Sequence, residues 1–482
     1  MTEVRDAAAD RGVMVSRAAV VAACVYGVLV AAGLGHFLLG IPIQLTDSFA
    51  NMLKLDTPWG ELMHGEFSQR SYLRPFLWAD LKLVYDASGG NYFAWFRGVH
   101  VVQVFALVLL YLRLVRPRTW EDAAFVPLGL AVLVGSHTFQ GTVTEAFPVN
   151  TFMTILLCCL AAANLALARP RWWNDLLALA LFVAAALTVE SGLLVWVIFT
   201  GAALTGARGV SRVGLTLLAG LLVGYFVLRF PVLHIGGPGL IERASGYGFH
   251  RLEPQELVQT FGANPIGFYA YNIVTSALSV LFAEPRAGVF DLTHGIVQGA
   301  VNPALVVNVV ASTAGTLLIA AFVAGRWRAW TRREFDRDDQ LVALFVAVLA
   351  ANAVISYPYT KDSIMSPAGA FFAVAVYAAA RRVLPRWVHH ARPAVAVAAL
   401  LLCVTVAATW AIRSAGTHVK LRTYAYRVRN EWIDAEGWVK RQQARLNDRE
   451  SALLHHLRFD AIYAHPLPPR IPLGRLSIFD VE

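Results

Sequence analysis

The sequence predicts an all-α polytopic membrane protein, and three observations support this fold class. Hydrophobic residues make up 57% of the 482 residues and charged residues only 15%, against roughly 45–50% and about 25% in soluble globular proteins. About eleven apolar runs are long enough to cross the hydrocarbon core of a bilayer. Arginines gather in every second connection between these runs. A soluble enzyme is therefore excluded.

About eleven transmembrane helices account for these apolar runs. They are expected near residues 18–39, 92–113, 121–138, 148–167, 174–189, 191–206, 213–230, 303–325, 341–356, 364–380 and 394–412. One further run, IGFYAYNIVTSALSVLF (Ile266–Phe282), is apolar enough to be another span. Counting it would move the later arginine-rich connections to the opposite side of the membrane, so a re-entrant or interfacial helix is expected there.

The connections differ in length between the two sides of the predicted bundle. On one side they are short and rich in arginine, as cytoplasmic loops are. On the other side lie three long segments, residues 40–91, 231–302 and 413–482. We therefore expect a transmembrane domain with two long outer loops over residues 1–412, followed by a short helical extracytoplasmic tail over residues 413–482.

The arginine pattern also orients the chain. The positive-inside rule places the N-terminus in the cytoplasm, and an odd number of spans places the C-terminus outside. The Ala- and Val-rich composition and the compact loops favour a bacterial inner membrane. The net charge of +9 follows from the loop arginines and does not indicate binding of nucleic acid. All four cysteines fall inside predicted spans, so neither a disulfide framework nor a cysteine zinc site is expected.

Ionisable side chains collect at the outer ends of the predicted spans, and they are the candidates for function because charge at membrane depth is costly. The carboxylates are Asp47 in QLTDSF, Glu145 in GTVTEAFPVN and Glu190 in LTVESGL. The other members are Arg70 and Arg74 in QRSYLRPF, Arg97 with His100 one helical turn later, and Lys361 in YPYTKDSIMSP. Such a set can deprotonate a hydroxyl and stabilise a departing phosphate. Because the outer face holds no ATP and the chain has no phosphate-loop motif, a lipid-linked phosphate is the simplest activated donor.

Four segments, in this order, resemble the multi-spanning GT-C glycosyltransferases, notably the tetratricopeptide-containing protein O-mannosyltransferases. SYLRPFLWADLKLVYDASGGNYFAWFRGVHVV (Ser71–Val102) resembles the segment that follows the catalytic loop of that family. LTVESGLLV resembles its Ser-Lys-Glu-Thr-Gly segment, and YTKDSIMSPAGAFFAVA its Arg-Tyr-Leu-Tyr-Pro-Ser-Gly-Phe segment, with Lys361 replacing a nearby arginine. RVRNEWIDAEGWVK (Arg427–Lys440) resembles the Arg-Asn-x-x-Trp helix after the last span.

This resemblance implies a GT-C fold, a polyprenyl-phosphate sugar as donor, and an inverting transfer to a glycan, lipid or protein acceptor outside the cytoplasm. Asp47 would accept the proton of the acceptor hydroxyl while the lipid phosphate leaves as an anion. Glu145 would orient the acceptor or help to hold a divalent metal, Mg²⁺ or Mn²⁺. Lys361, Arg74 and Arg97 would bind the phosphate. Further contacts with the substrates would come from Arg70, Tyr72, Trp59, His100 and Glu190.

The sequence departs from the family at two points, and two other functions stay open. Thr46-Asp47 stands where the family has two acids, and no tetratricopeptide repeat is recognisable. A transporter or flippase of a lipid-linked or hydrophobic solute would show two related halves with broken helices near the midplane. The other open function is that of a non-catalytic GT-C-like assembly partner, which would not need the second acid of the first loop.

The candidate residues also have ordinary structural explanations. Asp47 is placed to cap a helix over DSFANML. Glu190, between two apolar runs, could pair with an arginine of the bundle. Lys361 could pair with the adjacent Asp362, and His100 could be a buried histidine of the bundle.

Overall fold

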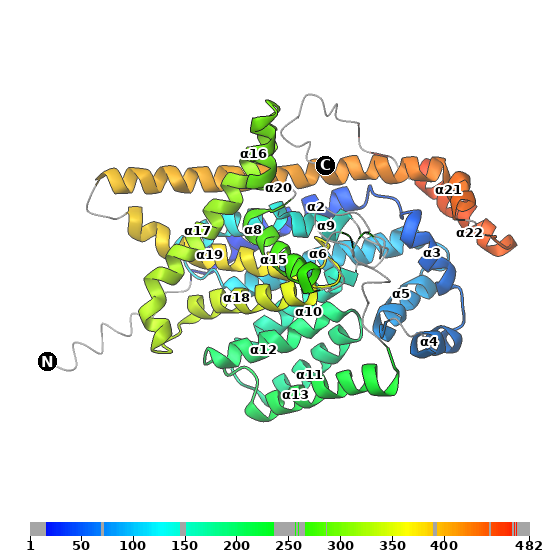
Figure 1. Cartoon of the computed structure of the whole chain (residues 1–482), viewed down its shortest axis with the longest axis horizontal. Helices are drawn as coiled ribbons and strands as arrows, with labels where there is room; N and C mark the ends of the chain where they lie inside the picture. The colour runs from blue at the N-terminus through cyan, green and yellow to red at the C-terminus, as the bar shows by residue number, and fades with distance from the viewer. Residues whose placement is uncertain are drawn as a thin grey trace.

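Every regular element in the described part of the chain is a helix (Figure 1). The computed structural model describes residues 16–68, 72–144, 151–235, 256, 259, 266–285, 287–388, 393–442, 445–464, 467 and 469, with the backbone only at residues 46, 47 and 144. The predicted all-α fold is confirmed for these residues.

Among the described residues, seven helices are long and apolar enough to cross a membrane. They are α2 (Arg17–Leu38), α6 (Tyr92–Val115), α13 (Arg212–Val227) with its π-helical end η2 (Leu228–Val232), α17 (Pro303–Thr331), α18 (Arg337–Ile355), α19 (Ser366–Val388) and α20 (Pro393–Ile433). An eighth candidate is bent by 62°: α7 (Trp120–Ala124) and α8 (Val126–Gly135) form one arm, and α9 (His137–Thr144) the other. By length and composition these helices identify an integral membrane protein.

All the apolar runs predicted as spans coincide with helices, but some of these helices are short. α10 (Thr151–Ala166), α11 (Trp172–Ala186) and α12 (Leu194–Leu204) have 16, 15 and 11 residues. A straight span needs about 20 residues, so the predicted number of about eleven spans stays a prediction. α15 (Ile266–Phe282), expected as a re-entrant or interfacial helix, packs against α17 and α18.

Helix α19 lies at the centre of the bundle. It contacts α8, α17, α18 and α20, and 83% of its most apolar stretch is buried. Its many alanines allow the neighbouring helices to approach closely. At Gly369 a Cβ atom would lie 2.0 Å from Thr138 Oγ1 of α9, so any larger residue would push the two helices apart. Only 22% of the corresponding stretch of α13 and 17% of that of α20 is buried, so both helices lie at the periphery.

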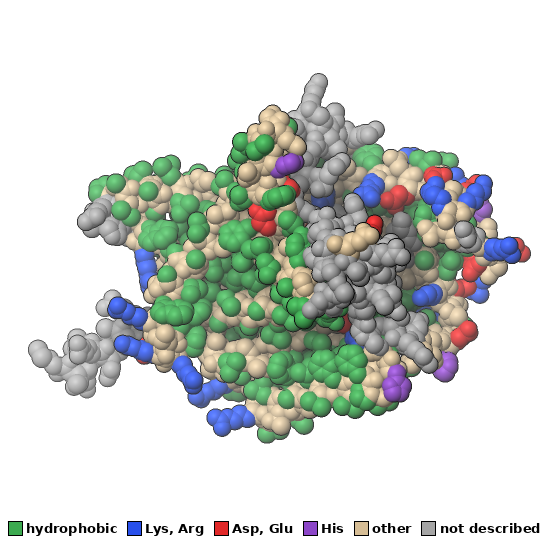
Figure 2. Space-filling view, viewed as in Figure 1, with side chains coloured by type: hydrophobic (Ala, Val, Ile, Leu, Met, Phe, Trp, Pro, Cys, Tyr) green, Lys and Arg blue, Asp and Glu red, His purple; other side chains and the backbone are tan. Residues whose placement is uncertain are grey.

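Apolar side chains cover the middle of the molecule, and charged side chains gather toward its two ends (Figure 2). This distribution fits a bilayer around the middle. At one end, helices of the first long loop lie beside those of the C-terminal tail (Figure 1). They are α3 (Thr46–Leu55), α4 (Trp59–Ser68), α5 (Pro75–Ala87), α21 (Ala435–Arg441) and α22 (Asp448–Phe459).

The C-terminal half of α20 connects the tail to this end of the bundle. The 41 residues of α20 measure ~62 Å at about 1.5 Å per residue, twice the ~30 Å of a hydrocarbon core. The predicted domain boundary between residues 412 and 413 falls inside this helix. Its far half lies on the first loop, where the side chain of Gln44 donates a hydrogen bond to the Tyr424 hydroxyl. Bundle and tail are therefore joined by one unbroken helix.

At the opposite end, arginines of the short connections pair with aspartates. Arg381 Nη1 lies 2.9 Å from Asp122 Oδ1, and Arg326 Nη2 lies 2.7 Å from Asp339 Oδ2. Each of these aspartates is also the N3 residue of a capping box, at the start of α7 and of α18. The arginine-rich connections predicted from the sequence thus join neighbouring helices at one end of the bundle.

Candidate functional site

Three charged side chains from distant parts of the chain meet where the first loop contacts the bundle. Glu190 Oε2 lies 2.6 Å from Arg74 Nη2, and Glu190 Oε1 lies 3.1 Å from Arg229 Nη1. Arg229 Nη1 also donates a hydrogen bond of 2.7 Å to the Tyr225 hydroxyl. We call Arg74, Glu190 and Arg229 the arginine–glutamate cluster. In this cluster Glu190 pairs with Arg229, an arginine of the bundle, as the structural explanation of Glu190 predicted.

Local backbone structure positions each member of the cluster. Glu190 begins the 3₁₀ turn η1 (Glu190–Leu193), between α11 and α12. At Gly192 of this turn a Cβ atom would lie 2.0 Å from the Ala185 carbonyl oxygen, so the turn can fold onto the end of α11 only with glycine. Arg229 lies in the π-helical η2, which contains Pro231. Pro231 has no N–H to continue the α-helical hydrogen bonding, and π-helical turns are frequent at functional sites.

Arg74 reaches the cluster because the first loop is fastened to the bundle beside it. Arg74 is the N-cap residue of α5. Two residues later, the backbone N–H of Phe76 donates to the Leu187 carbonyl oxygen at 3.1 Å. The Arg74 guanidinium lies 4.0 Å from the centre of the Tyr72 ring. Tyr72, predicted to contact substrate, therefore supports an arginine of the cluster in this structure.

The cluster has an excess of positive charge and unused hydrogen-bond donors. It combines two guanidinium groups with one carboxylate, and the Arg229 side chain is only 5% exposed. The Nε atoms of Arg74 and Arg229 are buried without a hydrogen-bond partner among the described residues. A buried donor without a partner costs about 1–3 kcal/mol, and more when charged. An anion that reached these donors would supply the hydrogen bonds they lack.

An apolar groove is built partly from the same elements as the cluster. It has a volume of about 430 Å³ and lies between α12, α13 and α18. Leu193, Trp196 and Phe226 line it. Leu193 ends the turn that Glu190 begins, and Phe226 follows Tyr225 directly. The groove therefore shares the η1 turn with Glu190 and the end of α13 with Tyr225.

Arg97 and His100 lie together but are occupied by the fold. Arg97 Nε donates to the Ile41 carbonyl oxygen and Nη2 to that of Pro42, each at 2.7 Å. His100 Nδ1 lies 3.5 Å from Arg97 Nη1, so these two residues, one helical turn apart in the sequence, share one helix face. Both side chains are buried. In this structure Arg97 thus holds the chain segment that leads into α3.

Lys361 lies in the turn between α18 and α19, which contacts the bent span. Asp362 Oδ1 is 3.9 Å from His137 Nε2 of α9. At Gly141 a Cβ atom would come within 3.0 Å of Asp362 Cβ, so α9 lies closely against this turn. Lys361 is half-buried there.

The other predicted site residues are only partly covered by the description. Asp47 is the second residue of α3, but its side chain lies outside the described part of the chain. Glu145 and Arg70 lie wholly outside the described residues. Trp59 of α4 is 41% exposed and donates from Nε1 to Asp86 Oδ2 at 2.8 Å. The catalytic roles expected of Asp47 and Glu145 stay predictions.

Arg229 and Tyr225 were not among the residues predicted from the sequence. Arg229 follows a long apolar run, in LRFPV, and an arginine at such a place is itself a signal of function because charge at membrane depth is costly. Nothing in the sequence indicates that Arg229 faces Glu190. Within the described residues, no three His, Cys, Asp or Glu side chains come together to hold a metal ion. The expected Mg²⁺ or Mn²⁺ stays a prediction.

Comparison of the chain with protein-family models, with curated proteins and with solved structures finds no match. The resemblance to GT-C glycosyltransferases therefore rests on the four sequence segments alone.

Proposed function

We propose that the chain is an integral membrane glycosyltransferase of GT-C type that moves a sugar from a polyprenyl phosphate to an acceptor on the side of its long loops, with inversion. One observation carries the proposal: the arginine–glutamate cluster shares the η1 turn and the end of α13 with the apolar groove between α12, α13 and α18. A polyprenyl phosphate has the same two parts, a charged head and a long apolar chain. Diffusion in the bilayer brings it to the groove.

The cluster is suited to a phosphate that leaves as an anion. Guanidinium groups bind phosphate oxygens through paired N–H donors, and the free Nε atoms of Arg74 and Arg229 are such donors. Glu190 holds both guanidinium groups in place. Fixed positive charge of this kind stabilises the charge that develops as the bond between sugar and phosphate breaks. Lys361 adds a further cation in this proposal.

Asp47 supplies the general base in this proposal. Its carboxylate accepts the proton of the acceptor hydroxyl while the hydroxyl oxygen attacks the anomeric carbon, and the lipid phosphate departs from the opposite face. The hydrogen bonds from Arg97 to the carbonyls of Ile41 and Pro42 position the segment just before Asp47. Glu145 orients the acceptor or helps to hold a divalent metal.

The positions of the segments that resemble the GT-C family support the same proposal. Arg74 belongs to the first of the four segments and Glu190 to the second, and their side chains are in contact. Trp432 belongs to the fourth, and it donates a hydrogen bond to the Ile43 carbonyl just before α3. Segments that are far apart in the sequence thus meet around the first loop.

The bent span is the observation that would favour a transporter, but the hydrogen bonds at its bend do not fit an ion site. Broken helices in transporters leave backbone carbonyls free to bind ions. At the end of α8 the Gly135 carbonyl accepts a hydrogen bond of 3.1 Å from Arg413 Nε, and the Val134 carbonyl accepts one of 2.8 Å from Thr417 Oγ1. The end of this helix is therefore capped by side chains of α20 rather than left open to a transported ion.

Purified full-length protein in liposomes tests the proposal. Polyprenyl-phosphate sugars with a radiolabelled sugar are supplied one at a time, with glycan, lipid and peptide acceptors. We expect transfer from one of these donors, loss of transfer in Asp47→Asn, and a large decrease in Arg229→Gln.

Arg212→Gln is the matched control, because Arg212 is exposed at the other end of α13. It should keep the wild-type rate. The proposal is wrong if no sugar moves from any donor, or if folded Asp47→Asn transfers sugar as fast as wild type. Equal effects of the two arginine substitutions would reject the cluster as the phosphate site.

A further inference from the structure

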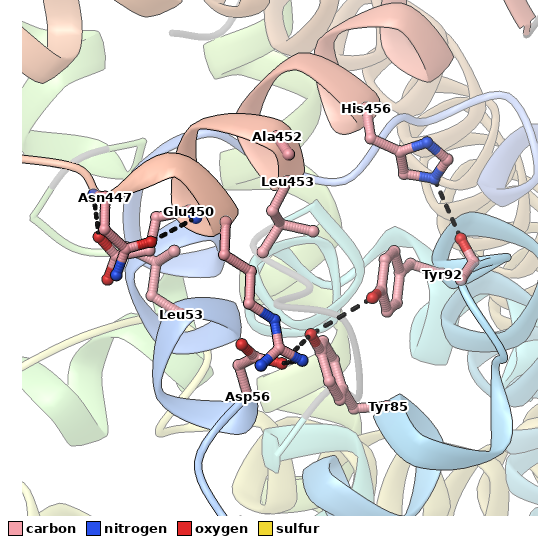
Figure 3. A pocket seen from close by; sticks show the side chains of 11 residues that line it. Leu53, Asp56, Tyr85, Tyr92, Asn447, Glu450, Ala452, Leu453 and His456 are labelled. Carbon is pink, nitrogen blue, oxygen red and sulfur yellow. Dashed lines mark hydrogen bonds and ion pairs between the residues drawn. The ribbon is translucent and has the colours of Figure 1, made fainter.

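A separate cavity of about 340 Å³ lies between the first loop and the tail helix α22 (Figure 3). One wall contains Asp56, Tyr85 and Tyr92, and the other contains Arg449 and His456. Its volume is within the range of small-molecule sites, which begins at about 300 Å³. The cavity exists only because the tail folds back over the first loop.

Two polar contacts hold the walls of the cavity together. Arg449 Nη2 lies 2.7 Å from Asp56 Oδ1, near the start of α22. Two turns later, His456 Nε2 lies 3.0 Å from the Gly90 carbonyl oxygen. Gly90 has a φ of +95°, a conformation that L side chains rarely adopt, and this turn carries its carbonyl group to the cavity. The cavity is thus preformed from both sides.

The hydroxyl groups of Tyr85 and Tyr92 lie in a row with Asp56 along one wall of the cavity. The rings of Tyr85 and Tyr92 stack with centroids 4.9 Å apart. The Tyr92 hydroxyl lies 3.3 Å from the Tyr85 hydroxyl, which donates to Asp56 Oδ1 at 3.2 Å. Burial, together with Tyr92 and Asp56, raises the pKa of the Tyr85 hydroxyl, so Tyr85 keeps its proton and remains a donor. Leu53 and Leu453 add apolar surface (Figure 3).

The charges around the cavity select a neutral ligand. Two carboxylates, Asp56 and Glu450, face one guanidinium, and Arg449 is already paired with Asp56. Glu450 accepts the backbone N–H of Asn447 in the capping box of α22. A phosphate or carboxylate ligand would meet these acids without an excess of positive charge to attract it. A polyol can instead accept from tyrosine and arginine and donate to the carboxylates.

We propose that this cavity binds a neutral carbohydrate. The C–H groups on one face of a sugar ring can pack against Leu53, Leu453 and the tyrosine rings. Its hydroxyl groups can form hydrogen bonds with the tyrosine hydroxyls and Asp56. Tyr85 follows Arg74 by eleven residues along α5, a separation of ~16 Å at about 1.5 Å per residue. The cavity is therefore distinct from the arginine–glutamate cluster, and the inference does not depend on the proposed transfer reaction.

Saturation-transfer difference NMR on the full-length protein in detergent tests the inference. The probes are the methyl glycosides of mannose, glucose, galactose and N-acetylglucosamine, each added alone, and inorganic phosphate observed by its ³¹P line width. Ala452→Trp fills the cavity, because Ala452 lines it. His455→Trp is the matched control, since His455 is an exposed residue of the same helix and does not line the cavity.

We expect at least one glycoside to receive saturation from wild type and from His455→Trp, and to lose most of that signal with Ala452→Trp. Tyr85→Phe, which removes one hydroxyl, should weaken the same signal and serves if Ala452→Trp does not fold. The absence of signal from all four glycosides, or an equal signal in Ala452→Trp and wild type, would overturn the inference. Broadening of the phosphate line that Ala452→Trp abolishes would identify an anion site instead.

Discussion

The indole Nε1 of Trp432, near the end of α20, donates a hydrogen bond of 2.5 Å to the backbone carbonyl of Ile43, just before α3. The two residues are 389 positions apart. Trp432 is fully buried, and its ring also packs edge-on against Phe49 with centroids 6.3 Å apart. The tail is thus fixed to the segment that carries Asp47 by both a hydrogen bond and ring packing.

Replacing Trp432 by Phe should destabilise this junction. The Ile43 carbonyl would lose its donor in a buried position, which costs about 1–3 kcal/mol, while ring packing against Phe49 is largely kept. The midpoint of thermal unfolding in detergent should fall. Trp172→Phe is the control, because Trp172 is 83% exposed. Equal midpoints for the two variants would contradict a role of this hydrogen bond in docking the tail.

Removing the charge of Glu190 should leave two guanidinium groups without their carboxylate. We expect Glu190→Gln to lower the free energy of unfolding by about 2 kcal/mol, as for hydrogen bonds to charged groups. In a double-mutant cycle with Arg229→Met, the two effects should not add, because the side chains are in contact. Glu121→Gln, at an exposed position of α7, should stay within about 0.5 kcal/mol of wild type. Additive effects in the cycle would show that the pair contributes nothing.

Glycine at position 192 should be required for the position of Glu190. Gly192→Ala would place a methyl group 2.0 Å from the Ala185 carbonyl oxygen, so the η1 turn must move and Glu190 with it. Gly220→Ala in α13 meets no atom within 4 Å and should be tolerated. Thermal unfolding of both variants checks this. A wild-type midpoint for Gly192→Ala would mean that the turn adapts at no cost.

Glu66 should make stability depend on pH. Burial raises the pKa of its carboxyl above the ordinary value of 4.5, although Lys54 and Arg74 act in the opposite direction. The folded chain therefore binds this proton more tightly than the unfolded chain. The contribution of Glu66 to the free energy of unfolding falls as the pH rises from 4.5 through the raised pKa.

Glu66→Gln should remove this decline, so the unfolding midpoint of the variant should change less than that of wild type as the pH rises above 4.5. Glu61→Gln provides the control, because Glu61 is an exposed residue of the same helix. If wild type and Glu66→Gln show the same pH profile, the Glu66 carboxyl makes no contribution.

The contrast between Arg97 and Arg229 shows how much of the site could be predicted. The spacing of Arg97 and His100 placed both on one helix face, and they do lie together. The partners of Arg97 are the carbonyls of Ile41 and Pro42, and no side-chain pattern marks a backbone acceptor in another segment. Arg229 carried a local signal as an arginine at the end of an apolar run, but its partner Glu190 could not be inferred from spacing.

The sequence alone determined the membrane location, the all-helical class and the positions of the apolar helices, because hydropathy and arginine spacing are properties of neighbouring residues. Only the tertiary structure decided which ionisable groups meet. Arg74 and Glu190 are 116 residues apart, and their contact depends on how the first loop folds back onto α11. The docking of the tail on the first loop also depends on packing between distant segments, and so does the cavity beside Tyr85. No local sequence pattern encodes such packing.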